Sequence, residues 1–258
     1  MPKHALETVL IPCLNDNYAV LAHDPESQST LLVDAPIATP ILHILEDNNW
    51  KLTHILLTHH HHDHIGGLAA LQGVTGATIY GPEESMSKVQ TIETGVKDGD
   101  TIKFGDLDIK VIASPGHTRD HLSFWIPDAE LAFTGDTLFA MGCGRVFEGT
   151  MEDMWFSLDR LAKLPPETTI YCGHEYTLSN GEFCLTIEPD NELLLQRMED
   201  VRAKRERGEP TIPTTMLDEL TTNSFLRANN AEVKEALGMA DASDLEVFTE
   251  IRSRKDNF

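Results

Sequence analysis

Residues 55–66 read ILLTHHHHDHIG, in which a short apolar run leads directly into five histidines and one aspartate. The apolar run is typical of a buried strand, and Gly66 together with the following Gly67 marks a turn before the helix-like LAALQ. Because residues two apart in an extended segment share a face, we expect His59 and His61 to point toward one metal ion. Asp63 and His64 would lie at the strand-to-helix corner, facing a second ion.

The same arrangement, an apolar run followed by a potential metal ligand, returns three times downstream. His117 follows IKVIASPG, Asp136 follows LAFTG, and His174 follows TIYCG. The strand ends of α/β sheets commonly bring together site residues from distant parts of a chain. A histidine-rich surface loop is the alternative interpretation, and this recurrence argues against it.

The chemistry of these seven side chains indicates a metal site. Imidazole and carboxylate groups suit zinc, iron or manganese, and the absence of cysteine from the set argues against a thiolate-rich structural zinc site. Seven ligands are too many for one tetrahedral ion. Two ions that share one carboxylate use all seven and leave a bridging position for water, as in hydrolytic two-metal centres.

The chain of 258 residues is long enough for one large domain or a main domain with a smaller appendage. From Leu6 to about Gly173, short β-type runs dominate and helical patterns intervene, which indicates an α/β domain. The helical patterns lie at residues 40–48, 65–72 and 151–163. Beyond Pro189 the strand signals vanish, so a helical domain is expected after a boundary near residues 175–190.

Two helices of this second domain carry clear end signals. Residues 192–208 form a long amphipathic pattern, and Gly208 marks its end. The last helix is expected to begin at Ser243, because Glu246 lies three residues further on, which is the spacing of a capping box.

The composition restricts the partners and the location of the protein. With 20 basic and 42 acidic residues, the formal charge of −22 would repel nucleic acid and an anionic membrane surface. No apolar stretch approaches the roughly 20 residues of a membrane span, and the start lacks a secretion-signal pattern. Four widely spaced cysteines without a CxxC pair fit a reducing compartment. We expect a cytoplasmic protein, with a monomer as the default state.

Several motifs resemble those of known proteins. The set THHHHDH with the later GHT, TGDT and GHEYT resembles the metallo-β-lactamase superfamily. Within it, IPCLNDNY at the start, LFAMGCGRVFEGT in the middle and RSRKDNF at the end are similar to the glyoxalase II family, the hydroxyacylglutathione hydrolases. The resemblance implies a metallo-β-lactamase-type αββα sandwich over residues 1–174, with a binuclear metal site. A small all-helical substrate-binding domain over residues 175–258 would follow.

The resemblance also implies how the ligands are shared. One ion would be held by His59, His61 and His117, the other by Asp63, His64 and His174, and Asp136 would bridge them. Zinc is the first expectation, with iron and manganese as alternatives. The catalytic residues would be Asp63 and Asp136, with a hydroxide that bridges the metals. His60, His62 and His121 match no ligand position and are expected to be loop residues or to orient ligands.

The reaction implied by the resemblance is hydrolysis of S-D-lactoylglutathione, and of related S-2-hydroxyacylglutathione thioesters, to the hydroxy acid and glutathione. This is the second step of methylglyoxal detoxification. The thiolate leaves readily, so no general acid is assigned. The implied substrate-binding residues are Arg145, Phe147, Tyr176, Arg252 and Lys255, whose cations would pair with the glycyl carboxylate of glutathione. Basic residues near a helix end also complement the helix dipole, which is the alternative interpretation of the last two.

Three positions depart from the family pattern. Phe147 lies where certain relatives have tyrosine, Asp120 where glycine is more common, and Ser224 where proline is found. They bear on affinity and local geometry more than on the reaction. The main alternative function is a glutathione persulfide dioxygenase with a single iron, which metal content and oxygen consumption would distinguish.

Overall fold

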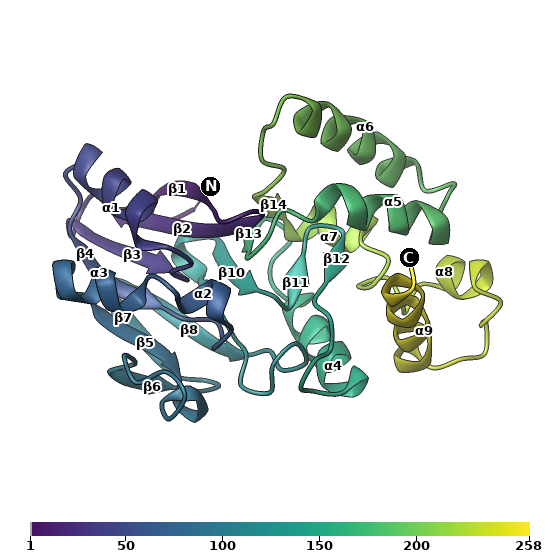
Figure 1. Cartoon of the computed structure of the whole chain (residues 1–258). Coiled ribbons are helices and arrows are strands. Elements are labelled where there is room, and N and C mark those ends of the chain that lie inside the picture. The colour runs from purple at the N-terminus through teal and green to yellow at the C-terminus, as the bar shows by residue number, and fades with distance from the viewer. Residues whose placement is uncertain (1) are drawn as a thin grey trace. The chain divides into compact units, whose positions relative to one another are not determined.

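The computed structural model describes residues 2–258 (Figure 1) and divides into two compact units. The first unit comprises Met1–Ala113 and Asp120–Gly135, and the second comprises Ser114–Arg119 and Asp136–Phe258. Neither division falls at residue 174, so the domain boundary expected there stays a prediction. None of the helices within residues 2–258 combines the length and apolar character that a bilayer span requires.

The first unit contains a six-stranded sheet in which the strands follow chain order. Its first three strands are antiparallel, and the pairs from β3 to β6 are parallel because helices carry the chain from β3 to β4 and from β4 to β5. The strands are β1 (Glu7–Cys13), β2 (Asn17–Asp24), β3 (Ser29–Val33), β4 (Leu52–Leu56), β5 (Thr78–Pro82) and β6 (Thr94–Val96). The connecting helices are α1 (Ala38–Asp47), α2 (His62–Ile65) and α3 (Leu68–Thr75).

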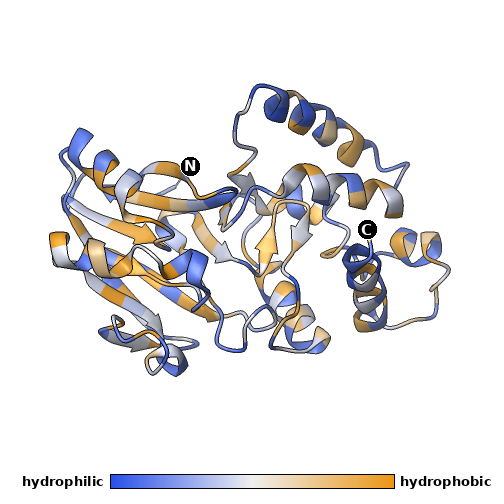
Figure 2. Ribbon diagram, in the orientation of Figure 1, coloured by the Kyte–Doolittle hydropathy of each residue, from blue (hydrophilic) through white to orange (hydrophobic). Residues whose placement is uncertain are grey.

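A continuous apolar core joins this sheet to its helices. Leu21, Leu32 and Ile55 of the sheet belong to one buried cluster with Ile41 of α1 and Leu71 of α3. Burial of such side chains is the main force that holds a helix on a sheet. Figure 2 shows hydrophobic residues along these strands and helices, interspersed with hydrophilic ones.

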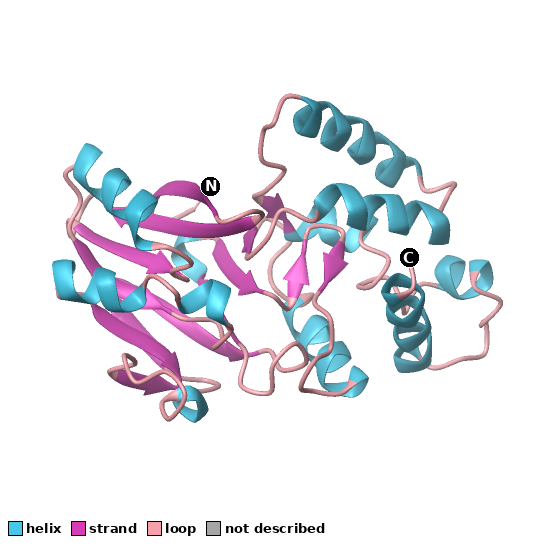
Figure 3. Ribbon diagram, viewed as in Figure 1, coloured by secondary structure: helices cyan, strands magenta, loops and turns pink. Residues whose placement is uncertain are grey.

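A second set of strands in the same unit pairs antiparallel in the order β7 to β10. Their bounds are β7 (Thr101–Phe104), β8 (Leu107–Ala113), β9 (Leu122–Ile126) and β10 (Leu131–Gly135), and two 3₁₀ turns are η1 (Glu83–Ser85) and η2 (Pro127–Ala129). The ring of His54 on β4 meets the ring of Phe104 on β7 edge-on, 5.4 Å between centroids. This ring contact joins the two sets of strands, both of which are seen in Figure 3.

The second unit is mainly helical (Figure 3). It contains the hairpin β11 (Leu138–Phe139) and β12 (Gly142–Cys143), and β13 (Thr169–Cys172), which pairs with β14 (Thr214–Thr215). Its helices are α4 (Met151–Leu161), α5 (Thr177–Ile187), α6 (Glu192–Glu206), α7 (Met216–Thr222), α8 (Ala231–Ala236) and α9 (Asp244–Asp256). The core between α5 and α6 is built from Met141, Cys184, Leu194, Met198 and Val201.

Most expected elements are present. Strands β8, β10 and β13 lie in the apolar runs that precede His117, Asp136 and His174, as predicted, and helices α1, α3, α4 and α6 match the predicted patterns within a few residues. The capping box at Ser243 is confirmed, with reciprocal bonds to Glu246. The short strand β14 is an addition to the helices predicted beyond Pro189.

One local prediction was wrong. The strand expected to continue through the histidines ends at Leu56, and His59 and His61 lie in irregular backbone. The partner strand β3 ends at Val33, and the Asp34 carboxylate accepts the backbone N–H of Thr58 (2.9 Å). That N–H is therefore bonded to a side chain instead of a neighbouring strand.

Candidate metal centre and substrate site

The first unit gathers three histidines and one aspartate just after β4. His59 and His64 are fully buried, and the ring centroid of His59 lies 4.6 Å from that of His61 and 4.2 Å from that of His64. The single helical turn α2 carries His64 together with Asp63, whose Oδ2 is 3.6 Å from His64 Nε2. Sequence neighbours thus form a compact cluster of possible metal ligands.

The second unit contains the other three predicted ligands, which also lie together. His117 belongs to a loop, Asp136 follows the end of β10, and His174 follows β13. The Asp136 Oδ2 atom is 3.4 Å from His117 Nε2 and 3.2 Å from His174 Nε2. One carboxylate oxygen therefore faces two imidazoles, and all three side chains are buried.

The spacing of these atoms suits a shared metal ion. Two ligands that each lie about 2.1 Å from a tetrahedral ion are about 3.4 Å apart. The donor pairs within each unit are separated by 3.2, 3.4 and 3.6 Å. The nitrogen and carboxylate donors and their separations fit a divalent transition metal. Five of the donor residues are buried, whereas the Asp63 side chain is 42% exposed; the buried residues are His59, His64, His117, Asp136 and His174.

Hydrogen bonds on the far side of the rings leave Nε2 for a metal. His64 Nδ1 lies 2.8 Å from Asp34 Oδ2, and His117 Nδ1 lies 2.9 Å from the carbonyl oxygen of Arg145. The Thr58 hydroxyl donates to Asp34, so it accepts from His59 Nδ1, 3.0 Å away. Such outer bonds fix the tautomer and the orientation of a histidine ligand.

Asp34 and Asn17 also contact this cluster, although neither was predicted from the sequence. Asp34 is 2% exposed and accepts hydrogen bonds from the backbone and hydroxyl of Thr58 and from His64. Asn17 Nδ2 donates to Asp63 Oδ2 at 2.9 Å. Asp34 closes the apolar run TLLV, so it follows the same pattern as the ligands. No comparable signal marks Asn17.

The remaining histidines of the motif have other contacts. His60 Nδ1 lies 3.2 Å from Asp120 Oδ1, and its Nε2 lies 3.2 Å from Lys88 Nζ. Asp120 also accepts from Ser85 and is buried. His121 stacks on His59, with ring centroids 5.0 Å apart. Asp120 therefore contacts the segment of predicted ligands through His60.

Three of the predicted substrate-binding residues expose their side chains. The Arg145 side chain is 63% exposed, and its Nε lies 3.8 Å from Asp256 Oδ1. Phe147 is also exposed, and its ring centroid is 5.2 Å from that of His117. The Tyr176 ring stacks on His174 at 4.8 Å. Two of these aromatic rings therefore lie against predicted metal ligands.

The other two predicted substrate-binding residues, Arg252 and Lys255, are more enclosed. Arg252 is 3% exposed, and its guanidinium donates to the Cys143 carbonyl at 2.9 Å. Lys255 Nζ donates to the backbone and hydroxyl oxygens of Ser179 at 2.9 and 3.0 Å. Burial lowers the pKa of Lys255, and the nearby charges of Arg252 and Arg145 lower it further. The substrate-contact assignments of all five residues stay predictions.

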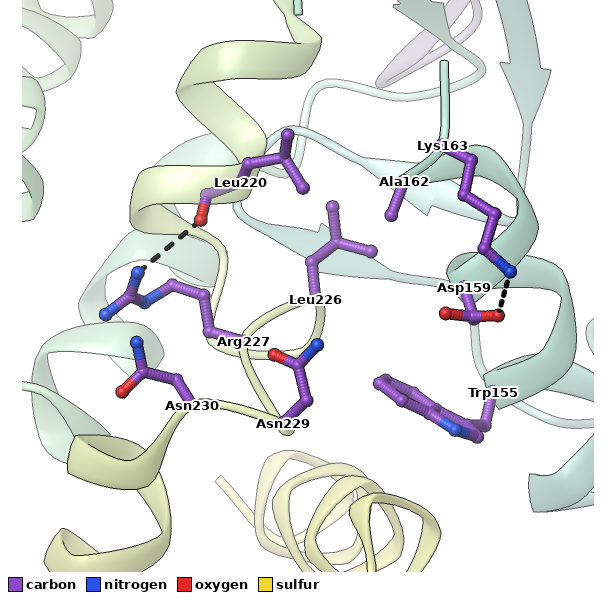
Figure 4. A pocket seen from close by; sticks show the side chains of 9 residues that line it. All are labelled: Trp155, Asp159, Ala162, Lys163, Leu220, Leu226, Arg227, Asn229 and Asn230. Carbon is purple, nitrogen blue, oxygen red and sulfur yellow. Dashed lines mark hydrogen bonds and ion pairs between the residues drawn. The ribbon is translucent and has the colours of Figure 1, made fainter. Parts of the chain in front are cut away.

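A separate cavity of about 290 Å³ in the second unit includes none of these residues (Figure 4). Its two cations are already paired, Lys163 with Asp159 at 2.7 Å and Arg227 with Glu188 at 2.9 Å. It is lined by Trp155, Asp159, Ala162, Lys163, Leu220, Leu226, Arg227, Asn229 and Asn230. We therefore place the functional site at the histidine clusters.

Known proteins are similar to this chain in fold and in sequence. Residues 17–174 match the metallo-beta-lactamase superfamily, and the structure is similar to ETHE1 from Myxococcus xanthus, with a TM-score of 0.68 and 26% identity over 96% of this chain and 89% of that one. BLEG-1, a B3 metallo-beta-lactamase, has the same fold at 18% identity, with a TM-score of 0.66 over 85% of this chain and 99% of that one. The chain is thus a metallo-β-lactamase-superfamily protein, and the predicted fold class is confirmed.

The family within that superfamily follows from closer relatives. Residues 175–258 match the hydroxyacylglutathione hydrolase C-terminus. Hydroxyacylglutathione hydrolases from Cereibacter sphaeroides and Methylococcus capsulatus are 50% and 46% identical, each over 98% of this chain and 99% of the relative. A hydroxyacylglutathione hydrolase from Rhizobium meliloti is 49% identical over 98% of this chain and 99% of the relative. The chain belongs to the hydroxyacylglutathione hydrolase family, and this family implies a pair of divalent metal ions on His and Asp ligands.

Proposed function

We propose that this protein is a thioester hydrolase that converts S-D-lactoylglutathione, and related S-2-hydroxyacylglutathione thioesters, to the hydroxy acid and glutathione. The observation that carries the proposal is the complete set of seven His and Asp donors in a member of this family. The donors within each unit have the separations of a metal site. The identity to hydroxyacylglutathione hydrolases over nearly the whole chain supports the same reaction.

We assign the seven donors to two ions, with zinc as the resident metal. His59, His61 and His117 would hold one ion, Asp63, His64 and His174 the other, and Asp136 both. Two divalent ions held there would activate a water molecule near neutral pH and polarise the thioester carbonyl. The sharing of Asp136 is supported by its one carboxylate oxygen, which faces both His117 and His174.

Asp63 and Asn17 would orient the attacking water. The amide of Asn17 fixes one carboxylate oxygen of Asp63, which holds the aspartate in place. Asp63 can then accept a hydrogen bond from the water, which directs a lone pair of the water oxygen toward the thioester carbonyl carbon. Collapse of the tetrahedral adduct expels glutathione as a thiolate. A thiol with a pKa near 8.5 needs no proton donor for that step.

We further propose that local cations offset the overall charge of −22, which repels the two carboxylates of glutathione. Arg145 and Lys255 would attract the glycyl carboxylate, with Arg252 behind them. The exposed rings of Phe147 and Tyr176 would pack against the peptide. A cytoplasmic location and a monomeric state are likewise proposals from the sequence.

The test is the rate of thioester loss from S-D-lactoylglutathione by the purified protein, measured together with its metal content. Rapid hydrolysis with about two metal ions per chain supports the proposal. Fully loaded protein that leaves the thioester intact would overturn it. Oxygen uptake with glutathione persulfide by protein that holds one iron would then identify the dioxygenase alternative.

A further inference from the structure

Three positive side chains of the second unit lie close enough to affect one another. The charges of Arg252 and Arg145 both lower the pKa of Lys255. Such a group is unusual in a chain with 42 acidic and 20 basic residues. Like charges repel, so the three cations need a counterion to keep a fixed arrangement when no substrate is bound.

One carboxylate supplies that counterion to two of them. Asp256 Oδ1 lies 3.0 Å from Arg252 Nη2 and 3.8 Å from Arg145 Nε. Arg252 also donates to the carbonyl of Cys143 and lies over the ring of Phe225. The end of helix α9 is therefore tied, through Asp256, to the segment after β12 that carries Arg145.

We propose that Asp256 is a positioning residue, which aligns the guanidinium of Arg145 for the glycyl carboxylate of the substrate. It makes no contact with the reacting atoms. This inference rests on the proposed function, because that function supplies the carboxylate to be recognised. Asp256 would thus belong to the substrate site, but it would act only through Arg145 and Arg252.

Two effects oppose each other when Asp256 loses its charge. Removal of a negative charge strengthens the attraction for an anionic substrate, but Asp256 is 37% exposed and Arg145 is 63% exposed, so water screens this effect. Arg252 is 3% exposed, and a buried cation without its carboxylate partner is costly. We therefore expect the loss of guanidinium alignment to outweigh the gain in attraction, so that the substrate binds more weakly.

The alternative is that Asp256 only stabilises α9, because it pairs with Arg252 four residues earlier. The same helix offers a matched control. Glu250 is 42% exposed and pairs with Arg254 four residues later at 2.8 Å. Glu250→Gln thus removes a pair of the same spacing on the same helix, between two partly exposed side chains and away from the cation group.

The experiment compares Asp256→Asn, Asp256→Glu and Glu250→Gln with the unaltered enzyme. Each is assayed on S-D-lactoylglutathione and on the same thioester with the glycyl carboxylate replaced by a carboxamide. Asp256→Asn should raise KM for the natural substrate about three- to tenfold, with kcat within about twofold, and leave KM for the carboxamide unchanged. Asp256→Glu should restore part of the loss, and Glu250→Gln should change neither KM.

An unchanged KM in Asp256→Asn would overturn the inference, and so would an equal rise for both substrates, which would indicate a purely structural role. A lower KM would show that Asp256 competes with the substrate for Arg145, and would overturn it as well. These outcomes leave the proposed function intact. If the unaltered, metal-loaded protein hydrolyses neither thioester, the proposed function fails and this inference fails with it.

Discussion

Replacement of Asp34 by asparagine tests whether the bonds behind the ligands hold the metal site together. Asp34 has a positive φ of 55°, a conformation that asparagine also tolerates, so the change leaves the backbone unstrained. The carboxylate accepts from Thr58 N–H at 2.9 Å through Oδ1, and from the Thr58 hydroxyl and His64 Nδ1 at 2.8 Å through Oδ2. An amide cannot accept on both atoms, so at least one of these three donors loses its acceptor.

The expected loss follows from those contacts. Removal of a residue that orients a histidine ligand lowers metal affinity about 10- to 100-fold, which corresponds to about 1.4–2.7 kcal/mol. A buried donor without an acceptor also lowers the free energy of unfolding by about 1–3 kcal/mol, because Asp34 is almost completely buried. Hydrolysis at limiting metal should fall in proportion to occupancy.

Competition with a chromophoric chelator measures the metal affinity, and urea unfolding of the metal-free protein measures stability separately. Asp128→Asn is the matched control, since Asp128 is 45% exposed and pairs only at the surface with Lys3. If Asp34→Asn binds metal as tightly as the unaltered protein does in this competition, the orienting role of Asp34 is refuted.

Three further changes give distinct results. Asp136→Ala should reduce bound metal below two ions per chain and abolish hydrolysis, and metal analysis showing full occupancy with near-normal activity would rule out a bridging role. Glu219→Gln breaks a buried pair with Arg197 at 2.5 Å and should cost about 3–5 kcal/mol in urea unfolding; a change below about 1 kcal/mol would contradict this. The hydrogen bond to Asp24 raises the pKa of His4 above the ordinary histidine value of 6.5. The full stabilisation by this pair is therefore present below pH 6.5, and it is lost as the pH rises through the raised pKa of folded His4. His4→Gln should therefore lower Tm at about pH 5.5 and have little effect at about pH 9, and equal shifts at both would argue against the linkage.

The sequence predicts some parts of this molecule better than others, for physical reasons. His59, His117 and His174 follow apolar runs, and burial of such runs fixes where the next polar residue emerges. The Ser243 cap depends on contacts three residues apart, so its motif is readable locally. The irregular path of His59 to His61 depends instead on the carboxylate of Asp34, which is distant in sequence. The burial of Arg252 likewise depends on the carbonyl of Cys143, 109 residues earlier.

Residue 145 makes contacts through two chemically independent groups. Its carbonyl oxygen accepts from His117 Nδ1, whereas its guanidinium lies near Asp256. A carbonyl is present whatever the side chain, so substitutions at this position can alter charge recognition while the histidine keeps its backbone acceptor. Under the proposed function, recognition of the thiol carrier could therefore change through the side chain of residue 145 while the backbone contact to His117 stays in place.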